Sequence, residues 1–213
     1  MNISDIVQMK ALDAAPRLLG QIISRITPAG EIRCRIVETE SYGGAEDKGS
    51  HAYGNRRTAR TEMMFRQGGT SYVYLIYGMY HCVNVVTGDV DDPQAVLIRA
   101  VEPLTKRDEQ LMTTLRPTDS RRMRNLSNGP GKLCQALAID KSLNGINLLA
   151  SGGLLRLEQS PDLENESFEI ECGPRINIDY AEEYASKPWR FYIKNHLYVS
   201  AKNAMPTTLL LDS

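Results

Sequence analysis

The alternation of apolar and polar residues predicts a chain of short strands and a few helices. Residues 10–19 place four apolar side chains on one helical face. The apolar segments 21–26 and 32–40 flank a Pro-Ala-Gly turn and predict a β-hairpin. Residues 43–71 form a long polar stretch rich in Gly and Arg, and a loop of this length in a compact domain is usually functional.

A second hairpin is predicted from two β-rich segments, 72–76 and 82–87, on either side of Tyr77-Gly78-Met79-Tyr80. The tip of this hairpin is aromatic. Exposed aromatic side chains suit a protein partner, a membrane or a nucleic acid. The alternative is that these rings fold back onto the core, and the pattern does not choose between the two.

The remainder of the chain predicts further short elements and little βαβ alternation. A strand is expected at 95–101 and at about 153–158, 168–172 and 190–194, and helices near 104–115, 119–125, 131–138 and 179–185. The fold class is therefore α+β, a single mixed domain over residues 1–213 around a mostly antiparallel sheet.

Composition narrows the class of protein. The 213 residues carry 25 Lys and Arg against 26 Asp and Glu, so the net charge is −1 and a histone-like polycation is excluded. No run approaches 18 apolar residues, and the amino terminus lacks a basic start and a long apolar run, so neither a membrane partner nor secretion is expected. The four widely spaced cysteines favour reduced core residues, which is typical of a cytoplasmic (nucleoid) or nuclear protein.

An acidic segment stands at the end of the second predicted strand. Strand alternation places Glu38, Glu40 and Tyr42 on one face and Thr39 on the other. Two acids and an aromatic ring entering a polar loop suit the lining of a cleft. Taken alone, however, the motif favours a solvated strand face.

Two basic runs occur in this otherwise neutral chain. Residues 116–141 hold six Lys and Arg against two Asp, and residues 48–66 hold five Lys and Arg against Glu62. Such runs are usually solvated faces, but two of them beside an aromatic hairpin tip favour contact with phosphates. No phosphate loop, dinucleotide, zinc-protease or serine-hydrolase motif is present, so the sequence predicts no cofactor and no metal.

Ordered motifs carry a resemblance to a known family. They are VETESY at 37–42, SYVYLIYGMYHCVNVV at 71–86, VLIRAVEP at 96–103, NGPGKLCQALAI at 128–139 and PWRFYI at 188–193. Together they resemble the 3-methyladenine (alkyladenine) DNA glycosylase family of the mammalian type, over about residues 10–200. The resemblance implies a curved antiparallel sheet with a protruding, DNA-intercalating β-hairpin.

The same resemblance implies roles for individual residues. Glu40 would activate the attacking water and Arg99 would help to hold it. The base-binding pocket would be lined by Tyr42, His51, Tyr74 and Asn84. The residues that enter the DNA would be Tyr77, Met79 and Tyr80. The implied partner is double-stranded DNA containing damaged purines, and the protein is expected to act as a monomer without a cofactor.

The implied reaction follows from the chemistry of these residue types. A nucleotide must leave the duplex before its glycosidic bond is accessible. Glu40 would then deprotonate water that attacks an oxocarbenium-like sugar, and the absence of lysine from the pocket motifs predicts simple hydrolysis without an imine. Two alternatives remain open from sequence: a non-catalytic binder of damaged or distorted DNA, and a small-molecule transferase that shares the fold.

Overall fold

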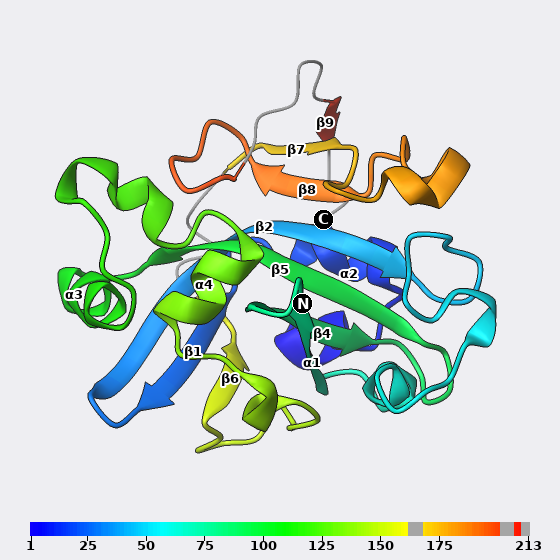
Figure 1. The fold of residues 1–213 in the computed structure, drawn as a ribbon, viewed down its shortest axis with the longest axis horizontal. Helices are drawn as coiled ribbons and strands as arrows, with labels where there is room; N and C mark the ends of the chain where they lie inside the picture. The colour runs from blue at the N-terminus through cyan, green and yellow to red at the C-terminus, as the bar shows by residue number, and fades with distance from the viewer. Residues whose placement is uncertain (162–167, 201–206, 210–213) are drawn as a thin grey trace.

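One antiparallel sheet organises the protein. In the computed structural model, which describes residues 1–161, 168–200 and 207–209, nine strands pair in the order β3-β4-β5-β2-β8-β7-β9, with β1 beside β2 and β6 beside β1 (Figure 1). The strands are β1 Ile22–Thr27, β2 Gly30–Gly43, β3 Ser71–Ile76, β4 Tyr80–Thr87, β5 Gln94–Pro103, β6 Leu155–Glu158, β7 Ile170–Gly173, β8 Arg190–Ile193 and β9 Thr207–Leu209. The mixed α+β fold around a curved antiparallel sheet that the sequence predicts is confirmed.

The long strand β2 lies at the centre of this sheet. Its first half pairs with β1, its second half pairs with β8, and β5 runs along its other edge. The register between β2 and β5 is interrupted at Val37 and Arg99, where Glu38 pairs with Ala100, and it returns to its original offset at Thr39. Two compensating irregularities of this kind bend a strand locally, and they occur where the acidic segment begins.

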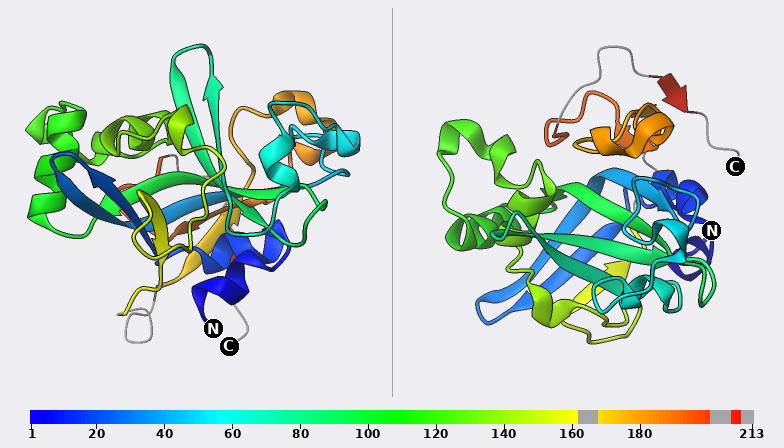
Figure 2. Two further views of the ribbon diagram at one scale, coloured as in Figure 1. Left: turned by 90° about the horizontal axis from the view of Figure 1, so that it is seen from below. Right: turned by 45° about the vertical axis from the view of Figure 1, so that its right-hand side comes forward.

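The hairpin of β3 and β4 leaves the plane of the sheet. Its strands pair from Ser71 with Val85 to Ile76 with Tyr80. Figure 2 shows it, in teal and green, standing away from the sheet between α4 and the loops of residues 43–71 and 174–184. The predicted protruding hairpin is therefore present.

Short helices cover both faces of the sheet. The α-helices are α1 Ile3–Val7, α2 Ala11–Arg17, α3 Lys106–Leu115 and α4 Pro130–Ala136, and the 3₁₀ helices are η1 Tyr53–Asn55, η2 Glu62–Phe65, η3 Ser120–Leu126, η4 Lys141–Leu143 and η5 Asp179–Tyr184. Helices α1 and α2 lie on one face, and α3 and α4 lie on the other (Figures 1 and 2). Among the described residues, none of these helices has the length and apolarity needed to cross a bilayer.

Local sequence accounts for where these helices begin and end. Thr105 caps α3 in a reciprocal pair with Asp108, so the helix starts at Lys106 rather than at 104. Pro130 opens α4, where a backbone N–H would have no partner within the helix and proline therefore loses no hydrogen bond. The predicted helix near 119–125 is the 3₁₀ helix η3, and the amino-terminal helix α1 and the strand β9 were not predicted.

The apolar faces meet in one main core between the sheet and the helices. It includes Ala15 of α2, Leu18 directly after that helix, Ile36 of β2, Ile98 of β5 and Leu133 of α4, all fully buried. All four cysteines are free and buried, as the sequence predicts for core residues. This packing leaves the hairpin tip and the polar loops around it outside the core.

Candidate active site

A cavity of about 390 Å³ opens beside the base of the hairpin. Its walls come from β2, β3, β4 and β5, from the start of α4, and from loops around residues 50, 60 and 177. The lining residues are Tyr42, Gly49, Ser50, His51, Arg60, Met64, Tyr72, Tyr74, Ile76, Tyr77, Tyr80, Cys82, Asn84, Ala95, Leu97, Arg99, Pro130, Gly131, Ile176, Asn177, Ile178 and Tyr180. A pocket of this size, with several aromatic side chains in its walls, is typical of a site for a small ligand.

Glu40 lies directly behind the cavity wall and is fully buried. Its Oε2 accepts a hydrogen bond from the Tyr42 hydroxyl at 2.9 Å, and its Oε1 accepts one from the Ile176 N–H at 2.8 Å. The same Oε1 lies 3.2 Å from Nη1 of Arg99. Because all three partners line the cavity, the carboxylate is held in one orientation immediately behind its wall.

Arg99 connects Glu40 to a second buried acid. Its Nε lies 3.6 Å from Oε1 of Glu38, and that carboxylate also accepts a hydrogen bond from Nη1 of Arg190 at 2.8 Å. Burial opposes the positive charge of Arg99, but Glu40 and Glu38 outweigh it and raise its pKa. The four residues form a buried charge chain, Arg190–Glu38–Arg99–Glu40, in which positive and negative groups alternate.

The interpretation of the acidic segment as a solvated strand face is therefore wrong. Glu38, Thr39 and Glu40 are all fully buried. Alternation correctly places Tyr42 beside Glu40 and Thr39 on the opposite face, where its hydroxyl donates to the Ala15 carbonyl of α2 at 2.8 Å. The sequence could not show that two arginines from β5 and β8 would compensate these acids.

The Tyr42 ring is supported from behind by a second buried ion pair. Arg175 contacts Asp47 through two nitrogen–oxygen distances of 2.5 and 2.7 Å. Its guanidinium carbon lies 4.7 Å from the centre of the Tyr42 ring and 5.1 Å from that of Trp189. Arg175, Asp47 and Ile176 were not predicted, because they lie in separate loops and no periodic pattern connects them.

The aromatic wall of the cavity is formed by His51, Tyr72 and Tyr74. The His51 ring packs edge-on against Tyr74, with 4.7 Å between centroids. Its Nδ1 lies 2.9 Å from the Tyr72 hydroxyl, and its Nε2 lies 3.4 Å from Nη2 of Arg60. A guanidinium only donates, so Nε2 accepts and the imidazole proton resides on Nδ1.

The titration of this wall follows from its surroundings. Burial, with the positive charge of Arg60 as a second cause, lowers the pKa of His51 to about 4. Burial likewise raises the pKa of Tyr72 to about 12, and the pKa of Tyr74 lies well above its ordinary value. The wall is therefore uncharged at neutral pH, apart from Arg60.

Asn84 lies on β4 at the inner end of the cavity and is buried. Its side-chain amide donates to the carbonyl of Tyr72 at 2.9 Å. That bond, across the pair of β3 and β4, sets the orientation of the amide plane. The predicted pocket residues Tyr42, His51, Tyr74 and Asn84 thus all line one cavity, with Arg99 beside them.

The hairpin tip is exposed rather than folded onto the core. Tyr77 is 72% exposed and Met79 is 65% exposed. The Met79 N–H bonds to the Ile76 carbonyl at 3.2 Å, and the two residues between them, Tyr77 and Gly78, have φ of 53° and 70°. This turn, in which both central residues adopt positive φ, directs the Tyr77 ring outward.

The Tyr80 side chain is less exposed than those of Tyr77 and Met79. A Cβ built on Gly131 would lie 3.1 Å from three atoms of Tyr80, so the ring packs directly against the first turn of α4. Tyr80 also lines the cavity. It therefore connects the hairpin to α4, and glycine at position 131 permits the close approach.

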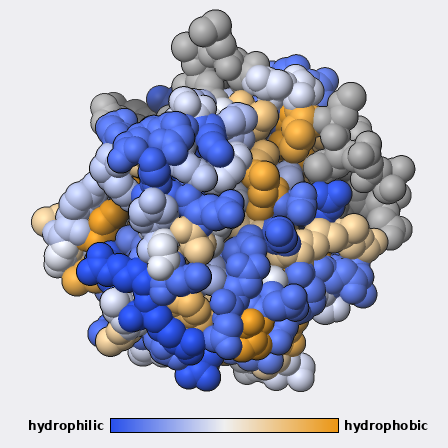
Figure 3. Space-filling model, turned by 90° about the vertical axis from the view of Figure 1, so that its right-hand side faces the viewer, coloured by the Kyte–Doolittle hydropathy of each residue, from blue (hydrophilic) through white to orange (hydrophobic). Residues whose placement is uncertain are grey.

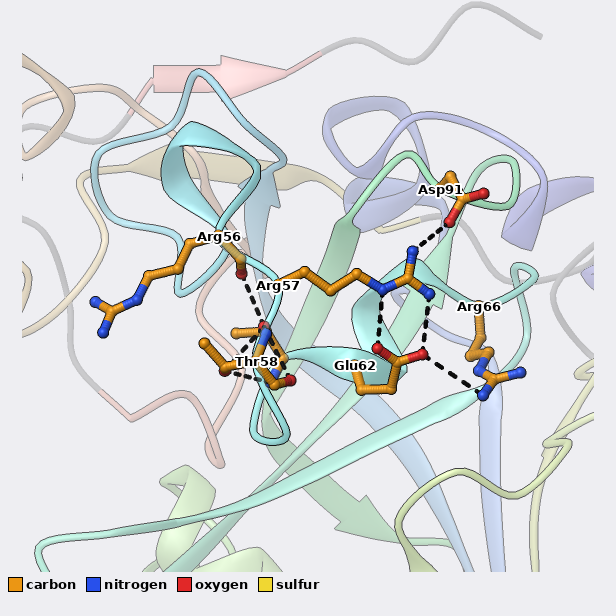
Figure 4. Close-up of polar contacts among 7 residues, drawn as sticks. Arg56, Arg57, Thr58, Glu62, Arg66 and Asp91 are labelled. Atoms are coloured by element: carbon orange, nitrogen blue, oxygen red, sulfur yellow. Dashed lines mark hydrogen bonds and ion pairs between the residues drawn. The ribbon is translucent and has the colours of Figure 1, made fainter.

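The arginines of the loop of residues 56–66 are not equally available: Arg57 and Arg66 contact Glu62, whereas the Arg56 side chain does not (Figure 4). Arg57 is neutralised by Glu62 through two short contacts and by Asp91 at 2.7 Å, and it also lies over the Phe65 ring. Arg56 points away from this network in Figure 4, with its guanidinium toward solvent. Only part of the run predicted to contact phosphates is thus available for them.

In the second basic run, residues 116–141, some side chains also form hydrogen bonds within the protein. Nη1 of Arg116 donates to the Thr118 hydroxyl and to the Asn125 carbonyl, each at 2.8 Å, so this arginine holds the chain of η3. Lys132 donates to the Asn128 side chain at 2.8 Å. The side chains of Arg121 and Arg122, which belong to the same run, lie outside the described part of the protein.

Polar side chains cover most of the side of the molecule that Figure 3 shows, with apolar patches between them. Within the described residues, no cluster of three or more His, Cys, Asp or Glu is arranged to bind a metal ion. The chemistry available at this site is that of a buried carboxylate, an arginine and aromatic rings.

Comparison with known proteins places these features in context. The family model for methylpurine-DNA glycosylase (MPG) matches residues 5–197. A protein of Natranaerobius thermophilus is 49% identical over 197 residues, which cover 91% of this chain and 95% of the relative. A protein of Bacillus cereus and one of Bacillus thuringiensis are each 48% identical over 195 residues, covering 90% of this chain and 94% of theirs. All three carry the name "Putative 3-methyladenine DNA glycosylase".

Proposed function

This chain belongs to the methylpurine-DNA glycosylase family, and we propose that it removes damaged purines from double-stranded DNA by hydrolysing the N-glycosidic bond. It is a DNA-3-methyladenine glycosylase, and DNA is its substrate. The observation that carries the mechanism is the position of Glu40. A carboxylate buried behind the wall of a cavity, with the lining residues Arg99 and Tyr42 beside it, is suited to activating one water molecule.

The first step is extrusion of the damaged nucleotide from the duplex. Unstacking and unpairing cost a few kcal/mol. Tyr77, the most exposed residue of the tip, fills the gap in the duplex and recovers about 1–3 kcal/mol by stacking. Met79 enters beside it. Tyr80 packs on α4 and holds the hairpin at its angle to the cavity.

The extruded base enters the cavity between its aromatic walls. Tyr42 is held by Arg175 on one side, so its other face is open to the base. Tyr74 and His51, which pack edge-on against each other, form another part of the wall. Asn84, with its amide fixed by the Tyr72 carbonyl, disfavours guanine because the exocyclic amine of guanine meets the amide.

Bond cleavage then needs one proton acceptor. The oxygen of the water forms a bond to C1′ of the sugar, the N-glycosidic bond breaks, and its electron pair leaves with the base. The proton of the water passes to Glu40, whose negative charge also stabilises the oxocarbenium-like sugar. Arg99 holds the water and keeps Glu40 in place.

The product is an abasic site and a free base. Among the described residues, the cavity wall contains no lysine, so no amine is placed to form an imine with the sugar. His51 is uncharged at neutral pH and is thus a poor proton donor to a neutral leaving base.

The alternative of a non-catalytic DNA binder requires Glu38 and Glu40 to be surface acids. Both are buried, and each is compensated by a buried arginine, which is costly unless the arrangement has a use. The test is a panel of duplexes, each with one defined lesion: 3-methyladenine, 7-methylguanine, hypoxanthine or ethenoadenine. Chromatography of the released free base should detect at least one of these products, whereas tight binding of every lesion without release would refute catalysis.

A further inference from the structure

Arg60 brings a positive charge to the aromatic wall of His51, Tyr72 and Tyr74. Its guanidinium carbon lies 5.2 Å from the centre of the Tyr74 ring, and its Nη2 lies 3.4 Å from Nε2 of His51. The residue lines the cavity although it belongs to the polar loop that follows η1. A full positive charge thus lies on the ring expected to stack on the flipped base.

The other charges around the cavity are compensated. Glu40 is paired with Arg99, and Asp47 is paired with Arg175. Within the described residues, Arg60 contacts no carboxylate, and its polar neighbours are the neutral imidazole of His51 and the hydroxyl of Tyr72. The aromatic wall is therefore positively charged, and no acid beside Arg60 in the described structure offsets it.

The loop that carries Arg60 is held in place on both sides. Arg57 is tied to Glu62 and Asp91, as Figure 4 shows. Between them, the Thr58 N–H donates to the Thr61 hydroxyl at 2.9 Å, and that hydroxyl donates to the Arg56 carbonyl at 2.8 Å. These bonds close a tight turn around Arg60, so its backbone is fixed relative to the cavity.

We propose that Arg60 determines the charge specificity of the pocket by disfavouring positively charged purines relative to neutral ones. Methylation at a ring nitrogen gives a purine a positive charge, whereas hypoxanthine is neutral. A cationic base meets the Arg60 charge and competes with it for the π face of Tyr74, because both are attracted by the same ring quadrupole. A neutral base meets neither penalty.

This proposal rests on the proposed function and refines it. Two unit charges about 5 Å apart repel by an amount that changes an equilibrium roughly fourfold in bulk water, and by more in a partly enclosed site. Arg60 is exposed, so the effect lies nearer the water limit. We expect the ratio of excision rates, 7-methylguanine over hypoxanthine, to rise roughly fourfold to tenfold when the charge is removed.

The experiment compares single-turnover rates on two duplexes that differ only in the lesion. Wild type, Arg60→Gln and Arg60→Lys are measured on 7-methylguanine and on hypoxanthine. Asn84 meets the exocyclic amine of 7-methylguanine in every variant, so its contribution cancels when the rate ratio of a variant is divided by that of wild type. Arg60→Gln should raise the ratio, while Arg60→Lys keeps it near wild type because the charge remains. Arg56→Gln is the matched control: it removes an arginine from the same loop that does not line the cavity, and its ratio should not change.

A ratio for Arg60→Gln that equals the wild-type value, or falls below it, overturns the role of Arg60 while leaving the proposed function intact. A similar rise in Arg56→Gln also overturns it, since the loop charge as a whole would then be responsible. If wild type releases other bases of the lesion panel but neither of these two, this inference alone fails. If wild type releases no base of the panel, the proposed function fails and this inference fails with it.

Discussion

Replacing Glu40 by glutamine separates catalysis from binding more cleanly than any other single change in this site. In Glu40→Gln the side-chain oxygen can still accept from the Ile176 N–H and Arg99, and the new amide can donate to the Tyr42 hydroxyl oxygen. Arg99 also retains Glu38 at 3.6 Å. We therefore expect the variant to fold, with a loss of about 1–3 kcal/mol in the free energy of unfolding.

The catalytic loss should be much larger than that. General-base catalysis contributes about 10²–10⁴-fold to a rate, and the lost negative charge near an oxocarbenium-like sugar adds to this. Lesion affinity should be unchanged or higher, since Tyr77, Tyr74 and the exposed arginines are unaffected. Glu46→Gln is the control, because Glu46 follows the same strand but is exposed.

The assay measures single-turnover base release and, separately, the affinity for the lesion duplex by fluorescence anisotropy. A Glu40→Gln variant that cleaves within about tenfold of wild type would refute the assignment of Glu40 as the base. Loss of cleavage together with loss of binding would show that the substitution disrupts the cavity instead. Glu38→Gln is unsuitable as a control, because Glu38 holds the buried Arg190.

Four further outcomes are expected. Tyr77→Ala should weaken binding to a lesion in a duplex by about 1–3 kcal/mol, and binding to the same lesion in a single strand by much less; equal losses would place Tyr77 outside the DNA gap. Borohydride should trap no protein–DNA adduct, and a trapped adduct would contradict simple hydrolysis. The lowered pKa of His51 means that the unfolded chain binds this proton first as pH falls, so stability should decrease between pH 6.5 and about 4. Urea unfolding at pH 7 and at pH 4.5 measures this decrease in the free energy of unfolding. His51→Gln should lose less stability than wild type between the two pH values, by on the order of 1–2 kcal/mol. Arg56→Gln should lower the log–log salt slope of DNA binding by about 1, and Arg57→Gln, whose charge is already compensated, by less.

Local sequence signals predicted the elements well where alternation and turn residues agree. The hairpin of β1 and β2 and the hairpin of β3 and β4 both follow from apolar alternation around turn residues, and the pairing of Ile76 with Tyr80 places Tyr77 at the tip. The four predicted pocket residues occupy a single cavity. What these residues do for DNA remains a prediction.

The contacts between distant segments could not be predicted from the sequence. Arg175 lies 128 residues from Asp47, and Arg190 lies 152 residues from Glu38, so no periodic pattern relates them. The acidic segment therefore resembled a solvated strand face, although it is buried. Likewise, the sequence predicted that both basic runs could contact phosphates, whereas Arg57 and Arg116 form hydrogen bonds within the protein.

The alternating charges of Arg190–Glu38–Arg99–Glu40 constrain how this protein can change over evolution. Loss of Glu38 alone would leave Arg190 buried without its carboxylate, at a cost on the order of 3–5 kcal/mol. Simultaneous replacement of Glu38 and Arg190 by neutral residues of similar volume would remove both charges and avoid that cost. Neutral evolution at Glu38 and Arg190 must therefore proceed by paired substitutions. Arg99 and Glu40 cannot be exchanged in the same way, because replacing both by neutral residues would also remove the groups proposed to carry out the reaction.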